Sequence, residues 1–222
     1  MEPRLSLLRQ HWVWALLICL LIGVGLIALW PRLAARPTQG TTAEKSLEEI
    51  GLYGKVPPFS LVDRSGKEIQ LSDLLGKVWI ADLIYTHCPD TCPVQSAEMK
   101  TLQDKFAREA DLRLVSITVD PKRDTPPVLD EYAARFGADP ARWFFLTGKE
   151  EAILRLAKEG FRLPAAEIPV PKRESGGATH AHSPRFVVVD RNGEIRGYFS
   201  ALEKESLVRL RRTVEFLLRG AK

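Results

Sequence analysis

The apolar and polar positions divide the chain into an N-terminal apolar run and a longer, patterned part. Residues 12–30 (WVWALLICLLIGVGLIALW) contain no charged side chain, and Trp12, Trp14 and Trp30 stand at the two ends of the run. A helix of about 20 apolar residues crosses the hydrocarbon core of a bilayer, and indole rings favour its interfaces. The run is longer than the apolar region of a signal peptide. We therefore expect an uncleaved, single-pass transmembrane anchor in residues 1–36, with a cleaved signal peptide as the alternative.

After the anchor, the pattern changes to alternating strand-like and helix-like segments. Residues 37–50 include proline and glycine and have little to bury, so we interpret them as a linker before a domain at 51–222. Residues 78–85 (VWIADLIY) are apolar except for Asp82 and predict a buried central strand. The expected elements are a hairpin turned at 64–66, strands at 78–85, 112–119, 143–146, 186–189 and 194–199, and helices at 93–108, 127–136, 150–159 and 203–219. This order predicts a mixed α/β fold with a central sheet flanked by helices.

One segment departs from this regular pattern. Residues 161–185 (FRLPAAEIPVPKRESGGATHAHSPR) hold four prolines, two adjacent glycines and two histidines. A structureless connection of this length is unusual in a compact domain, and long loops often carry function. We expect a functional loop here.

Composition and charge exclude several classes of protein. Of 222 residues, 45% are hydrophobic and 27% are charged, which is typical of a globular chain. Much of the net charge of +4 lies in residues 1–36, and the rest of the chain is close to neutral. We see no basic stripe and expect no nucleic-acid partner. Three cysteines do not make a disulfide scaffold.

The chemistry concentrates directly after the predicted central strand, in THCPDTCP at 86–93. Cys88 and Cys92 are four residues apart, so in the first turn of a helix they would share one face. A helix N-terminus also stabilises thiolates. Two thiolates suit Cu(I), or Zn²⁺ when further ligands complete the shell. Inert buried cysteines are the plainer alternative, and the flanking prolines and polar residues argue against it.

A third ligand has to come from elsewhere in the chain. Past residue 11 the histidines are His87, His180 and His182. His87 adjoins Cys88, and successive side chains point apart, which disfavours it as a co-ligand. His180 and His182 precede a predicted strand, so either imidazole could lie over the cysteine pair.

Three separated motifs together resemble the Sco/SenC family of membrane-anchored, thioredoxin-like copper-binding proteins. They are IYTHCPDTCP at 84–93, SITVDPKRDTP at 116–126 and HSPRFVVVDRNGEI at 182–195, and the resemblance covers about residues 45–219. It implies a thioredoxin-like fold and copper ligation by Cys88, Cys92 and His182. His180 remains a competitor, because THAHS stands where the family has a sequence similar to VDHS.

The resemblance also implies a role and a place in the cell. It implies a copper chaperone that delivers Cu(I), with Cu(II) left open, to the dinuclear copper site of cytochrome c oxidase during assembly. We expect the domain on the periplasmic face of a bacterial inner membrane and a partner thiol reductase, because exported cysteines drift to disulfides. Asp120 matches the family's aspartate in VDP, and we expect it either to orient an imidazole ligand or to serve as a plain turn residue.

The sequence is also compatible with functions other than that of a copper chaperone. A thiol–disulfide oxidoreductase using Cys88 and Cys92 on a partner's cysteines is the alternative, although its usual CxxC motif is one residue shorter. A peroxiredoxin would need Thr three residues before its reactive cysteine, and Tyr85 and Pro89 stand there instead. A zinc enzyme with two cysteines and one histidine ranks last. We expect a metallochaperone rather than an enzyme.

Overall fold

The computed structural model describes residues 50–167 and 180–220, and only these are discussed below. They belong to one compact unit, Ser46–Lys222. The anchor expected in residues 1–36, most of the linker and part of the loop at 161–185 lie outside the described residues. Within the described ranges, no helix has both the length and the apolar character that spanning a membrane requires.

A seven-stranded mixed sheet forms the centre of this unit, with the strand order β2-β1-β5-β4-β3-β8-β9. The three central strands, β3, β4 and β5, run parallel, and β8 and β1 pair antiparallel on either side of them. The strands of this sheet are β1 (Ser60–Asp63), β2 (Glu68–Gln70), β3 (Val78–Ile84), β4 (Leu112–Thr118), β5 (Trp143–Thr147), β8 (Arg185–Val189) and β9 (Ile195–Ser200). The predicted mixed sheet is confirmed.

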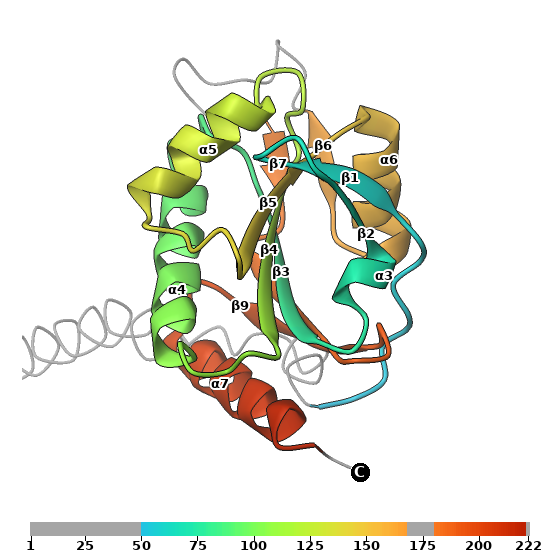
Figure 1. The fold of residues 1–222 in the computed structure, drawn as a ribbon, viewed down its shortest axis with the longest axis vertical. Helices are drawn as coiled ribbons and strands as arrows, with labels where there is room; N and C mark the ends of the chain where they lie inside the picture. Colours follow the sequence, from blue (N-terminus) through green and yellow to red (C-terminus); the bar gives the residue numbers. More distant parts are fainter. Residues whose placement is uncertain (1–49, 168–179, 221–222) are drawn as a thin grey trace, which may run out of the picture. The chain divides into compact units, whose positions relative to one another are not determined.

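Helices cover both faces of the sheet. Figure 1 shows α4 and α5 on one side of the central strands and α6 on the other. A hydrogen bond between Ser96 and Tyr132 joins α4 to α5, and an ion pair of 3.0 Å between Lys105 and Glu215 joins α4 to α7. The helices are α3 (Leu71–Leu74), α4 (Thr91–Lys105), α5 (Pro126–Arg135), α6 (Glu150–Arg155) with a π-helical turn η1 (Leu156–Gly160), and α7 (Lys204–Leu218).

Burial explains why β3 occupies the middle of the sheet. All seven of its residues are buried, which matches its apolar sequence and its helix-covered faces. Large aromatic side chains, among them Trp79 of β3 and Trp143 and Phe145 of β5, are fully buried in the core. The parallel crossovers place the carboxyl ends of β3 and β4 at one edge of the sheet, and the cysteines follow β3 there.

The described part of the loop expected at 161–185 contains regular structure. Two short strands, β6 (Ala165–Glu167) and β7 (His180–His182), form a separate antiparallel pair. Both of the loop's histidines lie on β7, whose backbone is therefore held by a partner strand.

Candidate metal centre

Cys88 and Cys92 lie where β3 gives way to α4. Cys88 occupies a turn, in which its backbone N–H donates to the carbonyl of Tyr85 at 3.2 Å, and Cys92 is the second residue of α4. The two cysteines do not share one helical turn, because Cys88 precedes α4 and Pro89 disfavours helical backbone at the residue before it. Both side chains are buried, and both cysteines are free thiols.

His182 lies close to the two cysteines although it is far from them in the sequence. It pairs with Ala165 in the β6–β7 ladder, and its Nε2 lies 3.1 Å from the Sγ of Cys92. The donor atoms of Cys88, Cys92 and His182 all lie within 4.8 Å of one another. The fold therefore brings together two sulfurs and one imidazole nitrogen from positions about ninety residues apart.

The imidazole of His182 is held so that Nε2 faces the sulfurs. Its Nδ1 lies 3.4 Å from the Ser183 carbonyl, and its ring meets the ring of Tyr85 edge-on, with centroids 5.7 Å apart. A carbonyl near Nδ1 favours a proton on that nitrogen and leaves a lone pair on Nε2. Two sulfurs and a neutral imidazole form a donor set suited to a soft or borderline cation such as Cu(I) or Zn²⁺.

The two thiols are electrostatically unequal. The pKa of Cys88 is lowered, chiefly because the Cys92 thiol donates a hydrogen bond to its sulfur, with a further contribution from His182. The pKa of Cys92 is raised, because its proton is held in that bond and because the side chain is deeply buried. In the metal-free pair this hydrogen bond favours the thiolate at Cys88 and the thiol at Cys92.

His180 faces a different partner from His182. Its Nδ1 lies 3.8 Å from Oδ2 of Asp120, and its ring packs against Tyr85 at 5.3 Å. The described ion pairs of the Asp120 carboxylate are therefore with His180 and Arg123 rather than with His182. Asp120 therefore lies near a histidine that is not part of the Cys–Cys–His group, and its expected role, orienting an imidazole ligand or shaping a turn, stays a prediction.

Asp124 holds the turn that carries Cys88, and sequence reasoning missed it. Its fully buried carboxylate accepts hydrogen bonds from the Thr86 backbone at 3.0 Å, the Thr86 hydroxyl at 2.6 Å and the Thr118 hydroxyl at 2.5 Å. The residue lies inside the motif at 116–126, which was its only signal in the sequence.

Asp82, like Asp124, is a buried carboxyl group near the site, and its charge interacts with His182. It lies within β3, opposite Ser116 of β4, and is 1% exposed. Burial raises its pKa to about 7, although Ser116 and His182 favour the charged form. Its signal in the sequence was the single charge in an otherwise apolar strand.

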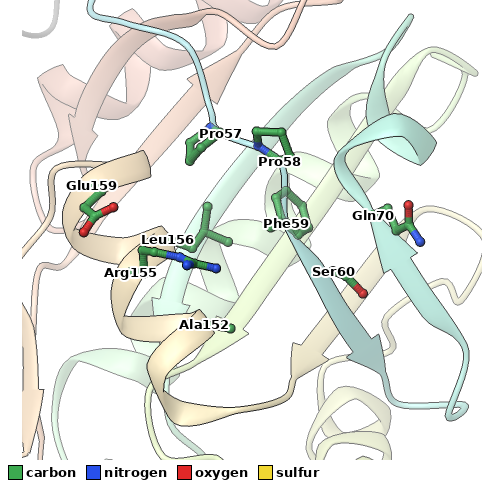
Figure 2. Close-up of a pocket in the computed structure, with 9 residues that line it drawn as sticks. All are labelled: Pro57, Pro58, Phe59, Ser60, Gln70, Ala152, Arg155, Leu156 and Glu159. Atoms are coloured by element: carbon green, nitrogen blue, oxygen red, sulfur yellow. The ribbon is translucent and has the colours of Figure 1, made fainter.

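A hollow elsewhere in the domain does not belong to this site. Figure 2 shows it between Pro57–Phe59 on one side and Arg155, Leu156 and Glu159 of α6 and η1 on the other. It encloses about 430 Å³, and its lining includes none of Cys88, Cys92 and His182. The metal-ligating geometry is thus independent of it.

Comparison with known proteins identifies the family. The SCO1/SenC family model matches residues 49–214, which contain the whole Cys–Cys–His group. The chain belongs to the SCO1/SenC family. The SCO1 protein homolog of Bacillus subtilis is 34% identical over 150 residues, which are 67% of this chain and 75% of that protein.

Solved structures of Sco proteins share the fold. BsSco, described as a member of the Sco family of cytochrome c oxidase assembly proteins with a disulfide switch, superposes with a TM-score of 0.65 at 30% identity. The match covers 78% of this chain and 99% of BsSco. Bradyrhizobium japonicum ScoI with copper bound superposes with a TM-score of 0.57 at 29% identity, and the match covers 72% of this chain and 99% of ScoI. The family and the thioredoxin-like sheet expected from the sequence are confirmed.

Proposed function

We propose that this protein is a membrane-anchored copper chaperone that binds one copper ion through Cys88, Cys92 and His182. The observation that carries the proposal is the approach of two buried sulfurs and one imidazole nitrogen to within 4.8 Å. Three soft or borderline donors satisfy Cu(I), which accepts low coordination numbers. Copper bound to Sco proteins of this fold supports the choice of metal.

The three proposed ligands are held by different parts of the fold, which suggests how copper could be delivered to a recipient. The cysteines lie against the central sheet, whereas His182 comes from the two-stranded β6–β7 pair outside it. A recipient can therefore compete first for the position of His182 and take copper by stepwise ligand exchange. We propose as recipient the dinuclear copper site of cytochrome c oxidase, because BsSco is described as an assembly protein of that enzyme. The proposed location is the periplasmic face of a bacterial inner membrane, where residues 12–30 anchor the chain.

An anaerobic titration of the reduced full chain with Cu(I), in competition with a chromophoric chelator, tests the metal site. We expect one tightly bound copper, lost in Cys88→Ser and in Cys92→Ser and weakened at least about tenfold in His182→Ala. His180→Ala is the matched control, because its ring faces Asp120, and it should bind copper like the parent chain. Equal weakening by the two histidine variants would contradict the ligand assignment.

Thiol–disulfide reduction of a partner is the second candidate function, favoured by the lowered pKa of Cys88. The Cys88 thiolate would attack a partner disulfide and release one partner thiolate. Cys92 would then attack Cys88, release the second partner thiolate and leave a Cys88–Cys92 disulfide. This step transfers two electrons to the partner, and a separate dithiol must reduce the pair again.

The same variants separate the two functions. With a peptide that contains one internal disulfide, Cys92→Ser should trap a mixed disulfide at Cys88 if the reductase pathway operates. His182→Ala should weaken copper binding and leave peptide reduction nearly unchanged. Tight copper binding without any trapped intermediate would favour the chaperone alone.

A further inference from the structure

A second hollow of about 380 Å³ adjoins the metal-ligating strand, and the proposed copper function does not use it. Side chains from three separate segments line it, namely Tyr53 before β1, Arg162 and Leu163 after η1, and Ser183, Arg185 and Tyr198 near and within β8 and β9. Ser183 directly follows His182, so the hollow opens next to the proposed ligand. Its lining combines apolar and aromatic walls with two guanidinium groups.

The charged side chains that line the hollow, Arg162 and Arg185, are both positive. Among the side chains that the structure describes, no carboxylate forms an ion pair with Arg162. Its guanidinium lies against Gly54, where an added Cβ would stand 3.4 Å from Nη2. The absence of a side chain at Gly54 therefore leaves room for the arginine head at the wall of the hollow.

The backbone of Arg162 is in a conformation that glycine usually adopts. Its φ is +54°, and among the described residues it is the only non-glycine with a positive φ. It follows η1, whose end is closed by hydrogen bonds from Phe161 N to the carbonyl of Leu156 and from Leu163 N to that of Ala157, both 2.8 Å. Helix ends of this kind favour glycine because L-residues pay a steric cost there. An arginine in this conformation, where glycine would carry no steric cost, points to a task for its side chain.

Tyr198 supplies an unused donor in the same hollow. The residue is 5% exposed, and its buried hydroxyl has no hydrogen-bond partner among the described residues. Burial raises the pKa of Tyr198 even though the Arg162 charge opposes the shift, so the phenol keeps its proton. Its ring packs edge-to-face against Tyr53 at 5.7 Å. Buried polar groups without partners are rare, and this one lines a hollow that a ligand can enter.

We infer that this hollow is a recognition site for a carboxylate carried on an apolar or aromatic body. The Arg162 guanidinium would bind the carboxylate oxygens, the Tyr198 hydroxyl would donate to one of them, and Leu163 and Tyr53 would contact the body. One uncommitted guanidinium matches a singly charged group better than a phosphate, whose second charge would lose solvent without compensation. The carboxylate comes either from a free small acid or from an acidic side chain of a protein docked over His182. The inference holds for the metal-free protein and is independent of copper.

Ligand-observed saturation-transfer NMR on the reduced, metal-free full chain tests the inference. Phenylacetate should show saturable binding, and its neutral isostere phenylacetamide should show none. Arg162→Gly should weaken phenylacetate binding at least tenfold, and its thermal midpoint should equal or exceed that of the parent chain because glycine favours the observed φ. Tyr198→Phe should weaken binding about threefold. Arg155→Ala, on α6 at the other hollow, is the matched control and should leave binding unchanged.

Two further binding experiments show where the carboxylate comes from and which anion the hollow prefers. A short peptide with one Glu should bind and its Gln counterpart should not. Tighter binding of the Glu peptide than of phenylacetate would assign the site to a docked protein, and the reverse order would assign it to a free acid. Equal binding by the parent chain and Arg162→Gly, no saturable binding at all, or inorganic phosphate outcompeting phenylacetate would each overturn the inference.

Discussion

The buried carboxylate of Asp124 binds both the backbone amide and the hydroxyl of Thr86, at 3.0 and 2.6 Å. Asp124 belongs to the loop after β4, whereas Thr86 begins the turn after β3 that leads to Cys88. The loop of one parallel strand therefore sets the path of the neighbouring strand's loop. The position of the first sulfur depends on a side chain 36 residues further along the sequence.

Replacing Asp124 should damage both the fold and the site. In Asp124→Ala, the Thr86 amide and the hydroxyls of Thr86 and Thr118 lose a charged acceptor inside the protein. We expect the free energy of unfolding to fall by about 2–4 kcal/mol in urea titrations. We also expect Cu(I) affinity to fall because the turn holding Cys88 loosens. Asp130→Ala is the control, since its side chain is 68% exposed and should change stability by less than about 0.5 kcal/mol. A loss below about 1 kcal/mol in Asp124→Ala would refute this positioning role.

Asp82 should make stability depend on pH. Its pKa is about 7 in the folded protein, against 3.8 for the unperturbed group, so the folded state keeps this proton to higher pH than the unfolded state. Its effect on stability is neutral below about pH 4 and grows unfavourable as pH rises toward 7. Asp82→Asn mimics the protonated carboxyl and should be more stable than the parent chain at pH 8, by at most about 4 kcal/mol.

The measurement is urea unfolding of both chains at pH 4.5 and pH 8, with a thiol reductant and a chelator present. The difference between the chains should be largest at pH 8 and fall to about 1 kcal/mol at pH 4.5. Asp130→Asn should follow the parent chain at both values. A stability difference that is the same at both pH values would show that Asp82 does not titrate in this range.

Alkylation should distinguish the two cysteines. Because the pKa of Cys88 is lowered by the hydrogen bond from Cys92, Cys88 should react with iodoacetamide well below pH 8. Cys92, buried and protonated, should react far more slowly. Mass spectrometry of the reduced, metal-free chain over a pH series gives both rates. Cys92→Ala removes the donor and should move the Cys88 profile to higher pH, and an unmoved profile would contradict the assigned cause.

Much of the fold was predictable from sequence because its elements carry strong patterns. The apolar run at 78–85 can only be a buried strand or a buried helix, and its length and β-branched residues favour the strand. The start of α4 was less predictable. We expected this helix to begin at Pro93, whereas it begins at Thr91 and so includes Cys92 but not Cys88.

The parts that sequence missed depend on distant neighbours. β6 and β7 are three residues long, and Ala-Ala-Glu and His-Ala-His carry no marked strand preference, so only their pairing defines them. Asp124 resembles any aspartate in a polar loop until the fold buries it beside Thr86 and Thr118. We expected Asp120 either to orient an imidazole ligand or to serve as a turn residue, and in the structure its carboxylate lies near His180, which is outside the Cys–Cys–His group. Such choices are set by packing rather than by local sequence.

The β6–β7 pair should control the third ligand without controlling the fold. Ala166 pairs with Ala181 between the two register positions that hold His180 and His182, and its side chain is exposed. Proline cannot donate in a ladder and distorts a strand, so Ala166→Pro should loosen β7 and weaken Cu(I) binding about tenfold. The seven-stranded sheet is separate, so unfolding free energy should change by less than about 1 kcal/mol. Ala166→Val favours the extended backbone and should retain the parent affinity. Combining Ala166→Pro with His182→Ala decides the cause: if the strand acts through His182, the double variant should bind no more weakly than His182→Ala alone, and additive losses would show that the strand pair supports the cysteines instead.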